Sequence, residues 1–436
     1  MCHNLIAQVH PNPESDVEYH PSSAAVIARV MCELNGKATR DGINLGPQYM
    51  LPKGLKVFGD KGRTATGKEL KQLHDRHCFQ PMDISKLSST ERRKAMDALM
   101  FLTEKRDKTV KGRMVYNGKP TREWLPKGEA ASPTVSQEAV FLTAIVDAKE
   151  ERDVMTADIP NAFIQAMMPE LGPGKERVIM KITGVLVDLL VEIAPEIYSP
   201  FVVFENGKKV LYVQVIRALY GMLIAALLWY KQFRKDLESI GFKFNPHNSC
   251  VANRKVRGKR HTVRFHVDDL MSSHVDPKVN DLFKKWLNKR YGEHGEVKAH
   301  RGKVHDYLGM TFDWSKPGTV EVGMTDYVSN MLDDFSIHMK PEDTAPTPAA
   351  ENLFAKGTGA KLDKERAKEF HTFVAKGLFL CKRARPDIHT AIALLTTRVN
   401  EPNEDDWKKL IRVLKYLNGT RNDKLILSAD DLSVIK

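Results

Sequence analysis

The sequence predicts an α+β fold, and three observations carry that prediction. Two short apolar runs flank Asn206-Gly207, a dipeptide typical of tight β-hairpin turns. Residues 223–240 place apolar side chains every three or four positions and end at Gly241, as an amphipathic helix does. The last part of the chain shows three more stretches with helical spacing, residues 364–382, 387–399 and 404–418.

Length and composition indicate a globular protein with a polyanionic partner. A chain of 436 residues is long enough for several domains or subdomains with substantial cores. Hydrophobic residues make up 42% and charged residues 28%, which is typical of globular proteins. The formal net charge of +12 favours a polyanionic partner, although many basic proteins never meet nucleic acid.

The cysteines and the apolar segments bear on location. Five cysteines are scattered along the chain, which argues against a zinc site or a disulfide framework and suits a reducing compartment. No apolar segment is long enough to span a bilayer, and the N-terminus lacks the basic region and apolar core of a secretory signal. We therefore expect an intracellular protein that is not secreted and has no membrane partner.

The first third of the chain gives weaker signals. Residues 1–80 are rich in Gly and Lys with weak periodicity, which predicts a partly disordered N-terminal extension. Residues 90–104 have helical spacing. A hairpin over residues 109–116, turned by Asn117-Gly118, is expected next, and in its strand Lys111 and Arg113 share one face. A strand face exposed only to solvent would show the same alternation.

Residues 262–273 contain the most informative pattern. The residues on both sides of Asp268-Asp269 predict two short strands that meet at a tight turn. With a period of two, Arg264, His266 and Asp268 share one face. Adjacent carboxylates at ~4 Å repel by about 4 kcal/mol under an effective surface dielectric, so one acid must be protonated, or a base or divalent cations must lie beside them. A metal site still needs a third carboxylate.

Other charged motifs are less specific. Three further Asp-Asp pairs, at 333, 405 and 430, lie at helix ends or in a polar tail. Asp158 ends an apolar run at 154–158 that predicts a buried strand, although an Asp that caps the next helix is the commoner use. The run at 254–260 has five Lys or Arg in seven residues. Such a hairpin tip is usually only solvated, but this one is expected one strand away from the acid pair.

Six motifs in order resemble the reverse transcriptase region of copia-type LTR retrotransposon polyproteins, over about residues 50–436. In chain order they are Asp158-Ile-Pro-Asn-Ala-Phe163, Ala218-Leu-Tyr-Gly221 with Trp229-Tyr230, His266-Val-Asp268-Asp269, Tyr307-Leu-Gly-Met310, Arg383-Ala-Arg-Pro-Asp-Ile388 and Leu414-Lys-Tyr-Leu-Asn-Gly-Thr420. Each motif alone is weak, but their order is specific. The resemblance implies a right-hand polymerase. Its fingers and antiparallel palm would span residues 81–340, and a linker with a helical thumb and connection segment would span 341–436. The chain stops where the family's RNase H domain would begin, which implies a polyprotein fragment or a broken copy.

The resemblance also implies a reaction, an RNA-directed DNA polymerase that works by two-metal nucleotidyl transfer. Asp158, Asp268 and Asp269 would be catalytic and would hold two Mg²⁺ or Mn²⁺ ions. These ions activate the primer 3′-hydroxyl and stabilise displacement at the α-phosphate. The partners would be RNA and DNA template-primers and deoxyribonucleoside triphosphates, in cytoplasmic virus-like particles and in the nucleus.

Two further sets of residues follow from the resemblance. The nucleotide would be bound by Lys111, Arg113, Phe163, Tyr220 and Gly221. Among these, Phe163 would be the steric gate against a ribose 2′-hydroxyl, with plain core packing as its alternative. The primer end would be contacted by His266, Leu308 and Gly309.

Three departures from the family pattern bear on activity. His266 replaces the usual aromatic hydroxyl, and its charge would vary near the ordinary histidine pKa of about 6.5. Ile224 stands where the family has a Gln against the nucleotide, and Ala166-Met167 replaces a small residue and an Asp. Two alternatives therefore stay open: a decayed, non-catalytic remnant that only binds nucleic acid, and a different palm-domain phosphotransferase, which the motif order disfavours.

Overall fold

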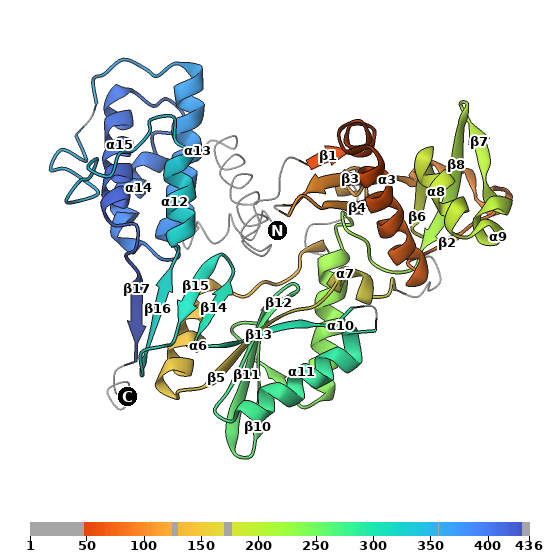
Figure 1. Ribbon diagram of the computed structural model, residues 1–436, viewed down its shortest axis with the longest axis horizontal. Helices are drawn as coiled ribbons and strands as arrows, with labels where there is room; N and C mark the ends of the chain where they lie inside the picture. The colour runs from red at the N-terminus through yellow and green to blue at the C-terminus, as the bar shows by residue number, and fades with distance from the viewer. Residues whose placement is uncertain are drawn as a thin grey trace.

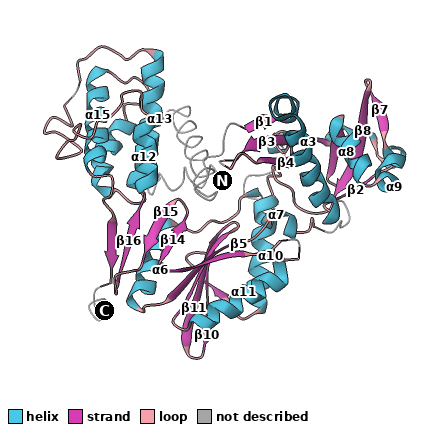
Figure 2. Ribbon diagram, viewed as in Figure 1, coloured by secondary structure: helices cyan, strands magenta, loops and turns pink. Residues whose placement is uncertain are grey.

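The structure is a computed structural model that describes residues 48–105, 107–123, 130–169, 177–293, 295–355 and 357–429. Their strands form sheets of seven, six and four strands. Figure 1 shows the seven-stranded sheet and the C-terminal helices on opposite sides of the six-stranded sheet. Figure 2 shows that the helices near the C-terminus gather apart from the strands. The α+β class predicted from the sequence is confirmed.

The seven-stranded sheet contains most of the N-terminal half. Its main path runs in the order β1 (Gln48–Met50), β3 (Met96–Glu104), β6 (Ile179–Thr183), β8 (Lys208–Val215) and β2 (Phe79–Pro81), with β4 (Val110–Tyr116) beside β3 and β7 (Val203–Glu205) beside β8. Helix α3 (Leu51–Asp75) packs closely on β4, because a Cβ on Gly112 would lie 2.7 Å from the Ala65 carbonyl oxygen. The shorter helices in this part of the chain are η1 (Ile84–Lys86), α4 (Ser89–Lys94), η2 (Pro120–Glu123), α8 (Val185–Ile193), α9 (Pro195–Tyr198) and η3 (Ser199–Phe201).

The structure differs from three predictions here. The expected hairpin at Asn117-Gly118 does not form, because β4 pairs with the preceding strand β3 and η2 follows it. Residues 48–80 were expected in an extension, but they form β1, α3 and β2 and contribute to the apolar core of this sheet. Residues 1–47 of that extension lie outside the described residues. Residues 90–104 were expected to be helical, but only α4 is a helix, started by a capping box of Ser88 and Glu91. The following residues form β3 because they pair with β4 and β6, and pairing overrides local spacing.

The six-stranded sheet is antiparallel and carries the Asp-Asp pair. Its order is β13 (Lys298–Gly302), β5 (Asp153–Asp158), β12 (Asp269–His274), β11 (Lys259–His266), β10 (Val251–Val256) and β9 (Lys243–Phe244). Helix α10 (Ala225–Ser239) covers one face, where the rings of Phe233 and Phe265 lie 4.9 Å apart between centroids. Helix α6 (Gln137–Lys149) covers the other face, where Arg264 donates to Asp147 at 2.8 Å. The remaining helices of this part are α7 (Ala162–Gln165) and α11 (Pro277–Tyr291).

The C-terminal part combines a small sheet with a group of helices. The four-stranded sheet has the order β14 (Val304–Tyr307), β15 (Met310–Asp313), β16 (Thr319–Gly323) and β17 (Leu425–Ser428). The helices are α12 (Thr325–Asp333), α13 (Lys364–Cys381), η4 (Pro386–Ile388), α14 (His389–Thr396) and α15 (Glu404–Gly419), and the last four lie within the three predicted helical stretches or within one residue of them. Because β17 pairs with β16, the expected boundary at residues 340 and 341 does not separate two independent sheets. One apolar cluster runs from the six-stranded sheet into these helices. Among the described helices, none combines the length and the apolar character needed to cross a bilayer.

Candidate active site

A two-residue turn carries the Asp-Asp pair. His266 of β11 pairs with Asp269 of β12, so Val267 and Asp268 form the turn. Val267 has a φ of 60°, a left-handed conformation that costs a β-branched residue on the order of 1–3 kcal/mol. The indole Nε1 of Trp229 on α10 donates a hydrogen bond to the Val267 carbonyl oxygen at 2.7 Å. This buried indole thereby stabilises a strained turn.

Strand pairing places four polar residues in a row across the end of the sheet. Asp269 pairs with His266 on one side and with Asp158 of β5 on the other, and Asp158 pairs with Lys298 of β13. Directly opposed residues share a face, with Cβ atoms about 4.5–5.5 Å apart. The row therefore holds two acids side by side, with an imidazole at one end and a base at the other.

Asp269, and not Asp268 as the sequence predicts, shares the face of His266. Strand alternation ends at His266, where the turn begins, so Asp268 does not share the face of Arg264 and His266. Its carbonyl oxygen instead accepts a hydrogen bond from the Ile159 amide at 3.3 Å, which holds the turn against the end of β5. Arg264 does share the face of His266, but it is fully buried beneath α6.

The acids suit a hard cation, although they do not form a complete metal site. Asp158 and Asp269 are partly buried and line one cavity, and carboxylate oxygens are the ligands that Mg²⁺ takes from proteins. Asp268 follows in the adjoining turn. In the described part of the chain, no group of three His, Cys, Asp or Glu side chains could hold a metal ion. The fold thus brings the three predicted acids to one end of a sheet, but it does not bring their three carboxylate groups together around one metal position.

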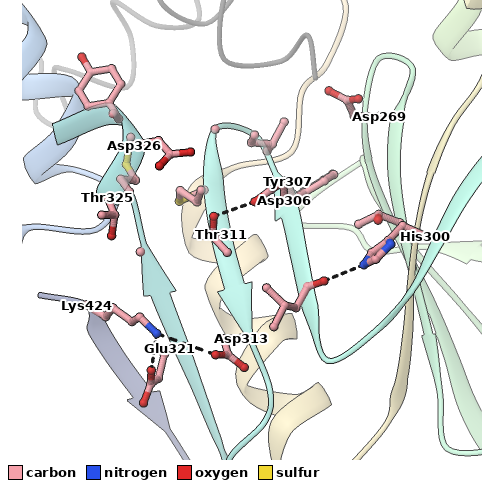
Figure 3. Close-up of a pocket in the computed structure, with 18 of the residues that line it drawn as sticks. Asp269, His300, Asp306, Tyr307, Thr311, Asp313, Glu321, Thr325, Asp326 and Lys424 are labelled. Atoms are coloured by element: carbon pink, nitrogen blue, oxygen red, sulfur yellow. Dashed lines mark hydrogen bonds and ion pairs between the residues drawn. The ribbon is translucent and has the colours of Figure 1, made fainter. Parts of the chain in front are cut away.

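Asp158 and Asp269 face a cavity of about 1110 Å³. The hairpin of β14 and β15 and helix α12 also line it, and Figure 3 shows Asp269 across the cavity from Asp326 of α12. The hairpin turns at Leu308-Gly309, whose φ angles of 53° and 78° are both positive, as a type I′ turn requires. Both turn residues line the cavity. The structure therefore brings this turn and Asp158 to the same space.

Burial determines the protonation of two groups near the acids. It lowers the pKa of His266 to about 4, and the guanidinium of Arg383 adds to this effect. The imidazole is therefore neutral at physiological pH, so the expectation of a charge change near pH 6.5 is wrong. Tyr307 is 4% exposed, and its hydroxyl has no hydrogen-bond partner among the described residues. Burial raises its pKa, so it stays a neutral phenol. Neither group offsets the charge of the acids, whereas Lys298 is a base within their row.

Residues expected to bind the nucleotide meet on the side of the seven-stranded sheet. The Arg113 guanidinium lies 4.4 Å from the centroid of the Tyr220 ring, and the Phe163 ring lies 5.0 Å from the same ring, edge-on. Phe163 also packs against both large apolar clusters. Lys111 lies two positions before Arg113 on β4 and is exposed. Gly221 is required by packing, because at its φ of 88° a Cβ would lie 2.2 Å from a carbonyl oxygen of β4.

Several residues of this site are not evident from the sequence. Lys298 enters the row through strand register, which no local pattern contains. Trp229 is predicted to be helical, but its bond to the turn depends on the fold. Glu69 and Gln72 of α3 link β4 to the loop before Phe163, and they lie in the region predicted as an extension. Residues three positions apart are neighbours on a helix, so this spacing is a signal by which the sequence could have placed both residues on one helix face.

The structure also places Ile224 and the basic run, the run at the hairpin tip where the sequence predicts it. Ile224 immediately precedes α10 and packs, half-buried, on the apolar cluster of the seven-stranded sheet. The basic run 254–260 spans the tip between β10 and β11, at the opposite end of β11 from His266. Because β11 has 8 residues, the tip lies roughly 25 Å from the acids at the usual rise per residue. The basic tip is therefore not part of this site.

Comparison with known proteins identifies the family. Residues 86–349 match the family described as reverse transcriptase (RNA-dependent DNA polymerase). A putative transposon Ty5-1 protein of Saccharomyces cerevisiae is 26% identical over 220 residues, which is 50% of this chain and 69% of that protein. The Pol polyprotein from transposon RE1 of Arabidopsis thaliana is 25% identical over 320 residues, 73% of this chain but 19% of the polyprotein. That from transposon TNT 1-94 of Nicotiana tabacum is 22% identical over 334 residues, 74% of this chain and 22% of the polyprotein. The chain thus spans about a fifth of these plant relatives.

Among solved structures, a foamy viral protease–reverse transcriptase in complex with double-stranded DNA matches with a TM-score of 0.45 at 12% identity, covering 96% of this chain and 59% of that one. In the right-hand polymerase that the motifs predict, the seven-stranded sheet would be the fingers, the six-stranded antiparallel sheet the palm and the C-terminal helices the thumb. The family match covers more than half of the chain, and the relatives are transposon proteins, as the order of the motifs predicts. This chain belongs to the reverse transcriptase (RNA-dependent DNA polymerase) family.

Proposed function

We propose that this chain catalyses RNA-directed DNA synthesis by nucleotidyl transfer. The observation that carries the proposal is the row in which Asp158 and Asp269 lie side by side. Both line a cavity that the Leu308-Gly309 turn also lines. A candidate metal-binding pair and a candidate primer-holding turn therefore border one space. Membership of the family supplies the class of reaction.

Asp158 and Asp269 would hold divalent cations, and Asp268 in the adjoining turn would assist them. The chemistry that such ions supply is a lower pKa for the primer 3′-hydroxyl and stabilisation of charge at the α-phosphate. When no cation is present, Lys298 would offset the repulsion between the acids. That repulsion is about 4 kcal/mol at ~4 Å under an effective surface dielectric. Trp229 would keep the turn, and with it Asp268, in one conformation.

The incoming nucleotide would bind between fingers and palm. Lys111 would contact the triphosphate as a point charge and Arg113 as a planar fork. The Tyr220 ring lies against both Arg113 and Phe163, so it would fix the orientation of the guanidinium and of the ring. Phe163 would act as the steric gate, because its ring would fill the space that a ribose 2′-hydroxyl needs. The substrates would then be deoxyribonucleoside triphosphates.

The primer end would be placed by the turn across the cavity. Leu308 and Gly309 would present backbone groups from their tight turn, and neutral His266 has one nitrogen that can donate and one that can accept a hydrogen bond. The partners would be RNA and DNA template-primers. An enzyme that copies transposon RNA would work inside the cell, in the cytoplasm or the nucleus.

Primer extension with Mg²⁺ on RNA and DNA templates tests the proposal. Asp269→Asn keeps the size of the side chain and removes its charge, so extension should fall by several orders of magnitude while the protein stays folded. Asp306→Asn is the matched control, since Asp306 lines the same cavity but only accepts a hydrogen bond from Thr311 at 2.7 Å. Wild-type extension by pure Asp269→Asn protein would refute the assignment.

A non-catalytic remnant that binds nucleic acid is the second candidate. It is favoured by the incomplete gathering of the carboxylates and by Ile224 and exposed Met167, which stand where the family has polar residues. It predicts salt-sensitive binding of template-primer by the wild-type chain with no extension under any divalent cation.

A further inference from the structure

A chain of hydrogen bonds connects the fingers to the palm through helix α3. Oε1 of Glu69 accepts a hydrogen bond from the Met114 amide of β4 at 3.2 Å. One turn along the helix, Gln72 donates from Nε2 to Oε2 of Glu69 at 3.0 Å. Oε1 of Gln72 in turn accepts from Nδ2 of Asn161 at 3.4 Å. Both ends of the Gln72 amide are therefore used, one toward each subdomain.

The two ends of this chain lie at the two halves of the proposed nucleotide site. Met114 directly follows Arg113, which lies against Tyr220. Asn161 lies between Asp158 and Phe163, in a left-handed conformation with a φ of 52°, and it begins helix α7. Loss of the attachment to α3 would therefore let the cations of β4 shift relative to helix α7, which carries the gate ring.

Glu69 is an acid placed beside the cations that are proposed to bind the triphosphate. Burial raises the pKa of Glu69 above its ordinary value, although the hydrogen bond from Met114 and the charges of Arg113, Lys111 and Arg76 act to lower it. A partly buried acid beside cations that should bind a triphosphate weakens their attraction for the ligand. Its compensating contribution is geometric, because it holds a backbone amide of β4 and the amide of Gln72 together.

We propose that Glu69 and Gln72 are positioning residues that set the distance between the phosphate-binding strand β4 and Asn161, at the start of the Phe163 helix α7. This inference rests on the proposed polymerase function. Two-point attachment matters because a misplacement of about 1 Å can cost a reaction on the order of 10²-fold. Within this series of hydrogen bonds, the long bond from Asn161 to Gln72 joins α3 to the residues before Phe163, so Gln72 is the residue to change.

Gln72→Met keeps the length of the side chain and removes both hydrogen bonds. Without the link, the apparent KM for deoxyribonucleotides should rise about 3- to 10-fold and discrimination against ribonucleotides should fall, while kcat changes less. Lys71→Met is the matched control, because Lys71 is on the same helix and makes only an exposed ion pair with Asp75 at 3.1 Å. Wild-type KM and sugar discrimination in Gln72→Met would overturn the proposal.

A double-mutant cycle separates this inference from the proposed function. Asn161→Gly suits the left-handed backbone and removes only the amide, so Gln72→Met and Asn161→Gly should be non-additive, both in nucleotide KM and in the urea midpoint of unfolding. Additive effects would show that the two residues are not linked. If the wild-type chain does not extend primers, the proposed function fails. The unfolding cycle still decides whether the link exists, and additivity there would overturn it.

Discussion

Replacing His261 with Gln should flatten the dependence of stability on pH below about 6.5. His261 is fully buried, and its Nδ1 accepts a hydrogen bond from Nε of Arg254 at 3.1 Å while its Nε2 donates to Oγ of Ser272 at 2.8 Å. Ser272 donates to Asn280 at 2.7 Å, and Asn280 donates to the Asp153 carbonyl oxygen at 2.9 Å. This chain ties β11 and β12 to β5, and therefore ties together the strands that carry the acids. It needs a neutral imidazole.

The size of the effect follows from the pKa of His261. Burial lowers that pKa to about 3, and Arg254, His274 and Arg152 act in the same direction. In the unfolded chain the pKa is about 6.5. Between these values the unfolded state binds a proton that the folded state does not, so stability falls as the pH falls. The loss is about 1.4 kcal/mol per pH unit and reaches about 5 kcal/mol near pH 3, which is comparable with the total stability of many domains.

Urea unfolding followed by tryptophan fluorescence, at several pH values between about 5 and 7.5, measures this slope. Gln can accept from Arg254 and donate to Ser272, so His261→Gln should lose only about 1–2 kcal/mol at neutral pH. Its slope below pH 6.5 should be smaller than that of the wild type by about 1.4 kcal/mol per unit. His266 and His305, whose pKa values are also lowered to about 4, remain in both proteins and cancel in the comparison. The control is His247→Gln, at an exposed position. Equal slopes in wild type and His261→Gln would refute the reasoning.

Other predictions concern the site directly. Phe163→Ala removes the ring beside Tyr220 and should raise ribonucleotide use relative to deoxyribonucleotide use; unchanged sugar discrimination would assign the ring to core packing. Ile224→Gln adds an amide before α10 and should lower the nucleotide KM several-fold, a gain of about 1 kcal/mol, with some loss of stability from the apolar cluster. A folded variant with the wild-type KM would show that position 224 does not reach the nucleotide. Trp229→Phe removes the hydrogen bond to the Val267 turn and keeps an aromatic ring against Phe233; kcat should fall about tenfold, equivalent to about 1.4 kcal/mol, with little change in KM. An unaltered kcat would mean that the turn does not depend on this bond. Template-primer affinity should fall steeply with salt, because Lys and Arg contacts release counterions from the phosphate backbone. A log–log slope near zero would exclude a phosphate-binding surface.

Local sequence was sufficient to predict the turns and helices whose conformation depends on neighbouring residues. Asn206 and Gly207 both adopt positive φ angles, 48° and 74°, which few residues tolerate, so their turn is predictable. Helix α10 and the C-terminal helices follow from apolar spacing, because one face of each contacts a core. The acid at the end of β5 and the acid pair in a turn are predictable in the same way. The motifs and their order also predict the family, since these short patterns report the chemistry of a site.

Only the tertiary structure decided how those pieces meet. Residues 96–104 fit a helix or a strand by spacing, and pairing with β4 and β6 selects the strand. Pairing of His266 with Asp269 puts Asp269, not Asp268, beside Asp158, and pairing of β13 with β5 adds Lys298. The neutral state of His266 depends on burial in an assembled core. Register and burial arise from contacts between segments far apart in the chain, and their free energy comes mainly from removing apolar surface from water. No window of neighbouring residues contains both partners of such a contact, so local patterns cannot specify it.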